Sequence, residues 1–369
     1  MPLILIGLGV LLVIYLQNYC YRRLWDKGLD FRVLYSQKEA FEGDEVVIRI
    51  ELTNKKILPL PWVHITAEMM KMFQLSEFEL DEKYGFLQNA GMFTSIMMFS
   101  KLRNRIFYVC NKRGVFRLQR AKVNVCNLLH TEEFYKEIKL DSELLVFPKT
   151  LDNFKEVDLL YKIVDSIVQS KALINPDPFE FKGIRDYQPT DTLKSINFKA
   201  TAISQKLMVN IHAPTTAYKL TLLLNTDFSQ NYSIEELYEQ SIRLAATLAK
   251  HYIELGASLS FVTNGRDISS GEPLLVRGGT SGMHMYSIYE ALARIDLHIR
   301  PKPMCEYVDT ITDKEQVFLF ISPYYSDEFM DSFHRLKQRQ VSAQMIIPYI
   351  KRPAVRLGSN VVIWDATPV

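Results

Sequence analysis

The stretch that decides the fold of the second half of this chain runs from residue 220 to residue 255 and reads LTLLLNTDFSQNYSIEELYEQSIRLAATLAKHYIEL. Four of its first five residues are leucine, which is typical of a strand buried on both faces. Ser233 and Glu236 then form a capping box for a helix that continues to about Leu255, and Gly256 stands at its C-terminal cap. The stretch therefore predicts a buried strand followed by an amphipathic helix.

The same alternation continues to the end of the chain. Further strands are expected at residues 259–262, 317–321, 345–347 and 361–364, and further helices at residues 283–295 and 327–337. Strands that alternate with helices favour a sheet whose neighbouring strands run parallel. Residues 215–369 are therefore predicted to form a mainly parallel, doubly wound α/β domain.

The first half of the chain has the pattern of short β-strands. The run Val46–Leu52 begins apolar and then alternates, directly after the turn signal Glu42-Gly43-Asp44. The runs Ile106–Val109 and Val115–Leu118 flank Asn111–Gly114, which favours a hairpin. Strands at this spacing predict a small β-sandwich over residues 30–148.

Basic residues are concentrated in one part of this β region. Residues 101–122 contain no acidic side chain and eight basic ones, which are Lys101, Arg103, Arg105, Lys112, Arg113, Arg117, Arg120 and Lys122. One interpretation is a patch that rests on anionic lipid headgroups. The other, which we favour, is the solvated face and edge of a sheet, where basic side chains discourage aggregation.

The N-terminus carries an apolar run without charge from Pro2 to Leu16. An aromatic fringe lies at the end of this run and just after it, and consists of Tyr15, Tyr19, Tyr21 and Trp25. This pattern predicts a transmembrane anchor over residues 1–21. Arg22, Arg23 and Lys27 follow, so the positive-inside rule places the rest of the chain on the cytoplasmic side of the cell membrane. A cleaved signal peptide is the less favoured alternative, because no Lys or Arg precedes the run.

Composition limits the function classes. The 369 residues are 48% hydrophobic and 23% charged, with a net charge of +2, so we expect two or three globular domains and no nucleic-acid binding. The four cysteines are widely separated and form no C-x-x-C pair, which indicates a reducing compartment. Only Cys110 and Cys126 are considered able to meet, across two strands.

The segment 181–202 reads FKGIRDYQPTDTLKSINFKATA and is rich in charges around one turn. Gln188-Pro189-Thr190-Asp191 is the turn, and Asp191 is expected to cap the helix that follows it. Leu193 and Ile196 are expected to form the inward face of that helix.

This segment resembles the signature of the bacterial domain-of-unknown-function family fifty-eight, F-x-G-x-R-x-Y-x-P-G-D-x-x-R-x-I-x-W-K-x-x-A. The matching positions are Phe181, Gly183, Arg185, Tyr187, Pro189, Asp191, Ile196, Lys199 and Ala202. The departures are mild: Thr190 replaces Gly, Lys194 replaces Arg and Phe198 replaces Trp.

The resemblance implies an architecture and a partner. Members of that family carry membrane helices, a β-rich region, the signature and a von Willebrand factor A-like domain. The expected fold class is therefore multidomain, with an anchor (1–21), a β-sandwich-like domain (30–148), a helical connector (149–214) and a von Willebrand factor A-like α/β domain (215–369). Family members are typically encoded beside MoxR-type AAA+ ATPases, which implies such an ATPase as the partner.

The signature has two open interpretations, a partner-docking surface and an inter-domain brace. The docking residues would be Phe181, Gly183, Arg185, Asp186, Tyr187, Pro189, Asp191, Lys194 and Lys199. In a brace, Arg185 and Lys199 would pair with Asp186 or Asp191.

The resemblance also raises the question of Mg²⁺, which von Willebrand factor A-like domains often hold through a D-x-S-x-S loop and a distant hydroxyl. The corresponding residues here are Asn225, Asp227 and Ser229, with Thr280 or Ser281 as the distant hydroxyl and Ser322 at the usual position of a further Asp. One carboxylate among neutral ligands makes a weak Mg²⁺ site, so turn and helix-capping roles are favoured and no other cofactor is expected.

Motifs for catalysis are missing from the sequence. There is no phosphate-binding G-x-x-x-x-G-K-[ST] loop and no H-E-x-x-H, and the seven histidines are scattered, which disfavours a zinc site. The sequence therefore favours a non-catalytic, membrane-anchored adaptor that docks a AAA+ ATPase or its client for protein assembly or maturation. The alternatives are an extracellular adhesion module that binds its ligand through a metal, and a hydrolase that uses the 225–229 rim with Asp186 and Asp191.

Overall fold

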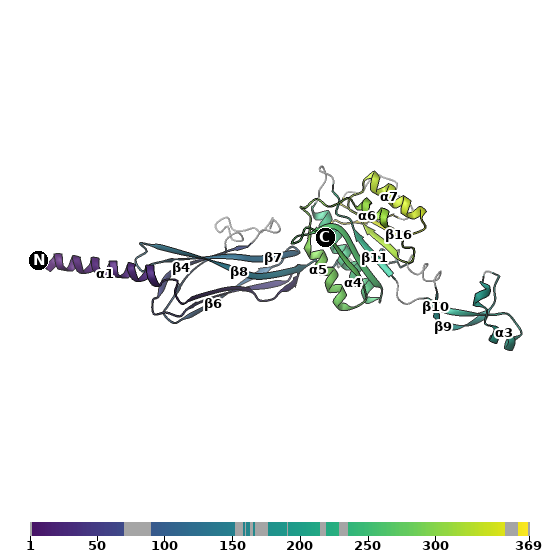
Figure 1. Cartoon of the computed structure of the whole chain (residues 1–369), viewed down its shortest axis with the longest axis horizontal. Coiled ribbons are helices and arrows are strands. Elements are labelled where there is room, and N and C mark those ends of the chain that lie inside the picture. The colour runs from purple at the N-terminus through teal and green to yellow at the C-terminus, as the bar shows by residue number, and fades with distance from the viewer. Residues whose placement is uncertain are drawn as a thin grey trace. The chain divides into compact units, whose positions relative to one another are not determined.

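A computed structural model describes residues 2–69, 90–151, 158, 160–162, 165–166, 176–189, 191–214, 219–228, 235–350 and 361–367. The chain divides into two compact units, Met1–Lys149 and Thr150–Val369, whose elements are drawn in Figure 1.

Among its described residues, the first unit contains one helix, α1 (Pro2–Leu24), and eight strands. The strands are β1 (Leu29–Tyr35), β2 (Glu39–Phe41), β3 (Glu45–Asn54), β4 (Leu60–Met69), β5 (Ala90–Ile96), β6 (Lys101–Val109), β7 (Gly114–Cys126) and β8 (Glu133–Phe147). They form two sheets, in the orders β1-β3-β6 and β2-β8-β7-β4-β5. All neighbours are antiparallel except β2 and β8.

The two sheets enclose one hydrophobic core. Burial alternates residue by residue along β3, so one face of that strand points inward. Leu52 from one sheet and Leu60, Ile65 and Val123 from the other are fully buried in the same cluster. Two antiparallel sheets that share a core in this way form a sandwich.

The predicted hairpin at residues 111–114 is wrong, because β6 and β7 belong to different sheets. The backbone of Cys110 instead bonds to the β2–β3 turn: it accepts from Gly43 N at 2.7 Å and donates to Asp44 O at 3.0 Å. Gly43 has a φ of +94°, a conformation that glycine adopts without a steric penalty. These bonds fix Cys110, which lies between β6 in one sheet and β7 in the other.

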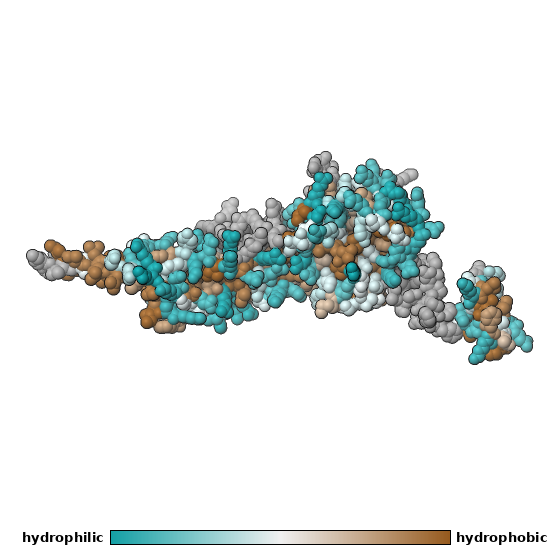
Figure 2. All heavy atoms as spheres, viewed as in Figure 1, coloured by the Kyte–Doolittle hydropathy of each residue, from teal (hydrophilic) through white to brown (hydrophobic). Residues whose placement is uncertain are grey.

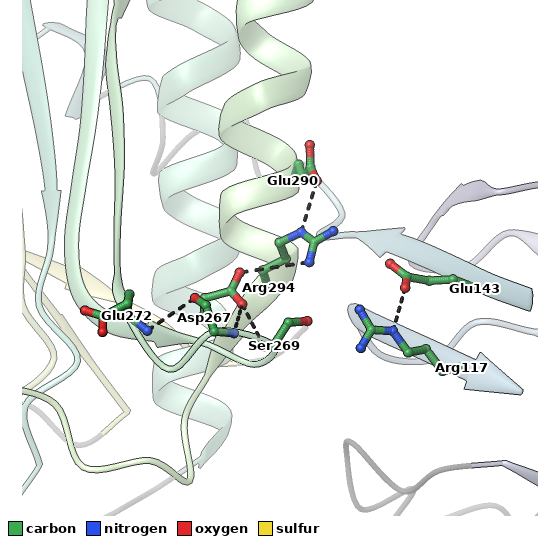
Figure 3. A network of polar contacts seen from close by, with 8 residues as sticks. Arg117, Glu143, Asp267, Ser269, Glu272, Glu290 and Arg294 are labelled. Atoms are coloured by element: carbon green, nitrogen blue, oxygen red, sulfur yellow. Dashed lines mark hydrogen bonds and ion pairs between the residues drawn. The ribbon is translucent and has the colours of Figure 1, made fainter. Parts of the chain in front are cut away.

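Several residues of the basic stretch 101–122 have partners on the sheet surfaces. Glu51 pairs with Lys101 at 2.6 Å and with Arg103 at 3.2 Å, and Arg117 pairs with Glu143 at 2.5 Å (Figure 3). Such pairs are expected on the solvated face of a sheet. Contact of this stretch with lipid remains a prediction.

Helix α1 is partly built into the first unit. Asn127 Nδ2 donates to Asn18 Oδ1 at 2.8 Å, and Tyr21 is 2% exposed, with its hydroxyl donating to Pro59 O at 2.7 Å. Exposed apolar side chains occur along this helix from Ile4 to Leu24.

In the part of the chain that the structure describes, no helix combines the length and apolar character needed to cross a membrane. This finding overturns the predicted transmembrane anchor over residues 1–21.

The second unit contains a seven-stranded sheet in the order β13-β12-β11-β15-β16-β17, with β14 also paired to β12. Its strands are β11 (Lys219–Leu224), β12 (Ser258–Asp267), β13 (Pro273–Gly279), β14 (Ile295–Asp296), β15 (Val317–Ile321), β16 (Ser342–Tyr349) and β17 (Val361–Asp365). Five strands are parallel neighbours, in the order β12-β11-β15-β16-β17. Strands β13 and β14 run antiparallel to β12.

Four helices accompany this sheet, α4 (Glu235–Glu254), α5 (Gly282–Arg294), α6 (Met304–Thr310) and α7 (Asp327–Gln338). Helices α6 and α7 pack on the sheet around Phe320, whose ring lies 5.5 Å from that of Phe333 and 6.3 Å from that of Phe329. The positions predicted for α5 and α7 are confirmed within a residue. Gly256, with a φ of +80°, ends α4 as predicted, while Ser233 lies outside the described residues.

The antiparallel edge was not predicted, and the turn after β12 explains it. Asp267 Oδ1 accepts hydrogen bonds from Ser269 N at 2.6 Å and Ser270 N at 2.8 Å, so the chain folds back as β13 (Figure 3). Arg294, at the end of α5, bonds Glu290 at 3.0 Å and lies 4.0 Å from Asp267. The Asp267 carboxylate therefore contacts both the turn after β12 and the end of α5.

Residues 158, 160–162 and 165–166 are helical, and the rest of the helix expected near 157–167 lies outside the described residues. Tyr161 stacks on His251 of α4 with ring centroids 3.7 Å apart. Nε2 of His251 is buried and has no hydrogen-bond partner among the described residues. Burial lowers the pKa of His251, although nearby carboxylates partly oppose this effect.

Acidification is expected to destabilise the second unit through His251. Because the pKa of His251 is lower in the folded state, the unfolded chain binds more protons below pH of about 6.5, and stability falls as the pH drops through that value. Thermal unfolding of the full chain at pH 7.5 and 5.5 measures this loss. His251→Phe should reduce the difference, while His298→Phe, at an exposed position, should not.

Candidate functional site

The signature segment forms a small structural module. Strands β9 (Pro176–Asp186) and β10 (Met208–Pro214) pair antiparallel, and their connection holds the short 3-10 helix η1 (Leu193–Ser195) and the helix α3 (Phe198–Ser204). Asn197 caps α3 by accepting from Ala200 N at 2.9 Å, and it donates to Asn210 Oδ1 at 2.7 Å. The connection is thus fixed to β10.

Arg185 and Asp191 brace the turn of this module. Their side chains form two parallel bonds, Nη1 to Oδ2 and Nη2 to Oδ1, each of 2.6 Å. Asp191 Oδ2 also accepts from Gln188 N at 2.8 Å. Hydrogen bonding to Arg185 and to the Gln188 backbone lowers the pKa of Asp191, so this carboxylate stays ionised. Asp191 was expected to cap the next helix, which is wrong, since Asn197 does so.

The other signature residues have varied positions. Gly183 pairs with Ile211 across the two strands, and Tyr187 N donates to Leu207 O at 2.9 Å. Pro189 lies in the turn, and Asp186, Lys194 and Lys199 are exposed. The side chain of Phe181, and Thr190 as a whole, lie outside the described residues. The brace is therefore made by Arg185 and Asp191 rather than by Lys199.

Five exposed apolar side chains cover the module, and they are called the apolar patch here: Ile184, Leu193, Phe198, Ile203 and Leu207. Leu193, Phe198 and Ile203 are 74%, 76% and 78% exposed, respectively. Figure 2 shows brown, hydrophobic surface on this module beside hydrophilic side chains. The expectation that Leu193 faces inward is wrong, because a two-stranded sheet and a seven-residue helix cannot cover so many apolar groups.

The loop predicted as a weak metal site lies at the carboxyl ends of β11 and β15. Asn225 is buried, and its Nδ2 donates to Ser322 Oγ at 2.9 Å. Both oxygens of Asp227 accept N–H bonds: Oδ1 from Asn264 Nδ2 at 2.8 Å, and Oδ2 from Met304 N, at the start of α6, at 2.9 Å.

Asn264 of β12 is the centre of this network. Its Nδ2 atom lies 3.1 Å from Asn225 Oδ1, 2.8 Å from Asp227 Oδ1 and 2.9 Å from Lys302 O. Its Oδ1 accepts from Thr226 N at 2.8 Å. An amide nitrogen is therefore surrounded by three oxygen atoms, the kind of ligand that a hard cation takes. Sequence reasoning missed Asn264.

Two further predicted ligands, Thr280 and Ser281, do not join this cluster. Thr280 follows β13, whose last residue Gly279 pairs with Leu259 near the start of β12. Asn264 is about 17 Å further along that strand, toward the opposite edge of the sheet. Ser281 instead caps α5 by accepting from His284 N at 3.2 Å, and Ser229 lies outside the described residues.

Burial raises the pKa of Asp227, even though three hydrogen bonds favour its ionised form. Its two oxygens serve the turn and the start of α6, which are the roles favoured from the sequence. The polar side chains at these strand ends, Asn225, Asp227 and Asn264, are thus bonded to one another and to the neighbouring backbone. They are called the rim here.

A third site was missed from the sequence, at the end of the β7–β8 hairpin. Cys126, His130 and Glu133 have potential ligand atoms that all lie within 4.8 Å of one another. Burial and the nearby Glu133 carboxylate raise the pKa of the Cys126 thiol. The signal was present as C-x3-H-x2-E, a spacing that became informative only when Cys126 and Glu133 were seen to pair across the strands.

Comparisons with known proteins leave the function open. No protein-family model and no curated protein matches the chain. The CARDB domain of the PF1109 protein of Pyrococcus furiosus, solved in complex with di-metal ions, is 8% identical, with a TM-score of 0.21, and the similarity covers 32% of this chain and 90% of that one.

Two further solved structures are similar to part of the chain. PapD-like domain 7 of human CEP192 is 11% identical with a TM-score of 0.19, covering 31% of this chain and 86% of that one. The DNA-bound alkylpurine DNA glycosylase AlkC of Pseudomonas fluorescens is 11% identical with a TM-score of 0.18, covering 31% and 30%. Similarity at this level carries no argument about function.

The predicted fold class is therefore corrected in two places. The described residues are mostly β-sheet, and among them neither a helix able to cross a membrane nor a von Willebrand factor A-like domain is found. In the second unit, the antiparallel strands β13 and β14 make the sheet mixed, because the Asp267 turn reverses the chain after β12.

Proposed function

We propose that this chain is a non-catalytic docking protein, which binds a partner protein through the apolar patch on the signature module. The observation that carries the proposal is the exposure of Leu193, Phe198 and Ile203 together. Clusters of exposed apolar side chains mark interaction sites on soluble proteins, because their contact with water is unfavourable. Phenylalanine and isoleucine side chains in particular gain about 1.5–3 kcal/mol each when a partner buries them.

The brace makes the patch suitable for binding. The two bonds between Arg185 and Asp191 fix the turn that leads into η1, and Asn197 fixes the start of α3. Leu193 and Phe198 are therefore held in place before a partner arrives, which reduces the conformational entropy lost on binding. In this proposal, the Arg185–Asp191 brace positions the apolar patch, and the patch binds the partner.

The charges around the patch define the partner. Lys194, Lys199 and Lys206 are exposed beside the apolar side chains, whereas Arg185 and Asp191 neutralise each other. A complementary partner offers an apolar groove with an acidic rim. The resemblance of the signature supports a MoxR-type AAA+ ATPase, or its client, as that partner.

Exchange of the patch for acidic residues tests the proposal. The double variant Phe198→Glu/Ile203→Glu should bind a purified MoxR-type ATPase at least about 30-fold more weakly than wild type in surface plasmon resonance, because central apolar contacts carry most of the binding energy. Arg185→Ala should also weaken binding of the ATPase. Arg185→Lys should weaken it as well, since lysine cannot form the two parallel bonds to Asp191.

Met283→Glu is the matched control, because Met283 on α5 is also an apolar residue that is 76% exposed. It should bind like wild type. Unchanged affinity of the double variant, or no binding of the ATPase by wild type, would exclude the proposed docking surface. We favour docking over a hydrolase or a metal-dependent adhesion module because both oxygens of Asp227 already accept hydrogen bonds from the protein.

A further inference from the structure

The hairpin between β7 and β8 brings a thiol and a carboxylate together. Cys126 is the last residue of β7 and Glu133 the first residue of β8, and the two are directly paired in the antiparallel register. Side chains of such a pair lie on the same face of the sheet with their Cβ atoms about 5 Å apart. The strand pairing alone therefore fixes two potential ligands beside each other.

The six-residue loop 127–132 is ordered by one buried side chain. Asn127 is fully buried, and its Oδ1 accepts from Thr131 N at 2.8 Å. Its Nδ2 donates to Thr131 Oγ1 at 2.7 Å and to Asn18 Oδ1 of α1 at 2.8 Å. The loop is thereby held in a single conformation against the helix.

That conformation places a third ligand. His130 has a φ of +55°, in the left-handed region, and its N–H donates to Asn127 O at 3.1 Å. A non-glycine residue in this region costs free energy and persists where the surroundings impose it, often at functional sites. Here it brings the imidazole within 4.8 Å of the Cys126 and Glu133 ligand atoms.

The three side chains also line a pocket of about 700 Å³ on the first unit. Trp62, His64 and Phe93 form its aromatic wall, with the rings of His64 and Phe93 stacked 4.0 Å apart. Asn124 lines the same pocket, and its buried Oδ1 accepts no hydrogen bond from any described residue. Buried carbonyl oxygens are rarely left unpaired, so this atom is available to a ligand in the pocket.

The geometry points to a zinc site formed by Cys126, His130 and Glu133, with its fourth coordination position open to the pocket. Thiolate, imidazole and carboxylate are the ligand types that Zn²⁺ takes, and three protein ligands with an open position are typical of zinc sites that bind a further molecule. A molecule in this pocket would bind the metal through one donor atom, place an apolar body against Phe93 and donate a hydrogen bond to Asn124. Its chemical class is a small aromatic or aliphatic compound with a metal-binding group.

Titration of the full chain with Zn²⁺ alone, and with Co²⁺ as a spectroscopic probe, tests this inference. Wild type should bind one metal ion per chain, and the Co²⁺ form should show a thiolate charge-transfer band and the strong visible absorption of tetrahedral Co²⁺. His130→Asn should weaken metal binding at least about 10-fold. Asparagine tolerates the left-handed conformation and position 130 is exposed, so the variant should fold.

Two controls separate this site from adventitious binding. Cys20→Ser removes a free thiol elsewhere, and His298→Asn removes an exposed histidine of the second unit; both should keep wild-type stoichiometry and affinity. The Co²⁺ charge-transfer band should disappear in Cys126→Ser and persist in Cys20→Ser. Equal metal affinity of His130→Asn and wild type, or a charge-transfer band that persists in Cys126→Ser, would overturn the assignment.

Discussion

Asn264→Asp is expected to destabilise the second unit by about 3–5 kcal/mol at pH 7, the cost of leaving a buried charge uncompensated. The substitution replaces an N–H₂ group that lies within 3.1 Å of three acceptor oxygens by a further oxygen. Two carboxylates, those of residue 264 and Asp227, would then face each other in a buried site. Urea unfolding of the full chain, with hydrogen exchange of β11 and β12 as the local readout, measures the loss.

The pH and cation dependence of this variant make the prediction specific. The facing carboxylates raise each other's pKa, so the folded variant binds more protons than the unfolded chain, and its stability should recover as the pH falls toward about 4. Millimolar Mg²⁺ or Ca²⁺ should also restore stability, because two carboxylates and Asn225 Oδ1 form an oxygen ligand set. Asn264→Ala should be destabilised without either rescue, and wild-type stability of Asn264→Asp at pH 7 without cations would contradict the interpretation.

Glu42→Ala is expected to destabilise the first unit by about 3–5 kcal/mol. Glu42 is buried, and its carboxylate accepts from Arg113 N at 2.9 Å and from Lys149 N at 3.0 Å. Arg113 is itself only 1% exposed, so the substitution leaves its buried backbone N–H without this acceptor. Thermal unfolding of the full chain, with hydrogen exchange of β2 and β7, reports the change.

Two neighbouring substitutions calibrate this result. Glu42→Gln keeps one oxygen acceptor but removes the charge, so its loss should lie between wild type and Glu42→Ala. Glu45→Ala, at an exposed position, should change stability by no more than about 0.5 kcal/mol. A loss in Glu42→Ala as small as that in Glu45→Ala would show that the buried carboxylate contributes little.

Local patterns predicted the individual elements well. The continuous apolar run Val317–Ile321 is β15, which is buried along its whole length, and the alternating run Val46–Leu52 lies in β3. Helix α7 begins at Asp327 as expected, after the cap Ser326. These features depend on residues within one turn or one strand of each other, so the sequence contains the information directly.

Pairing between distant segments could not be predicted in the same way. The sequence placed Asn111–Gly114 in a hairpin, but bonds from the β2–β3 turn to Cys110 move β7 into the other sheet. It also expected Leu193 to be buried, although the module offers no surface to cover that side chain. Both errors arise because the free energy of a turn or an apolar residue depends on partners far away in the chain.

By itself, the sequence determined many of the strands and helices and which segment carries the charged signature, because hydrophobic periodicity and capping residues act over a few residues. It expected a helical connector over residues 149–214, where the structure instead has the paired strands β9 and β10 around α3. Only the tertiary structure decided what the polar residues do. It showed that Arg185 braces Asp191, that Asn264 fills the centre of the rim, and that Cys126, His130 and Glu133 meet. The physical reason is that hydrogen bonds and metal ligands are specified by distances of a few ångströms, which strand register and loop conformation set.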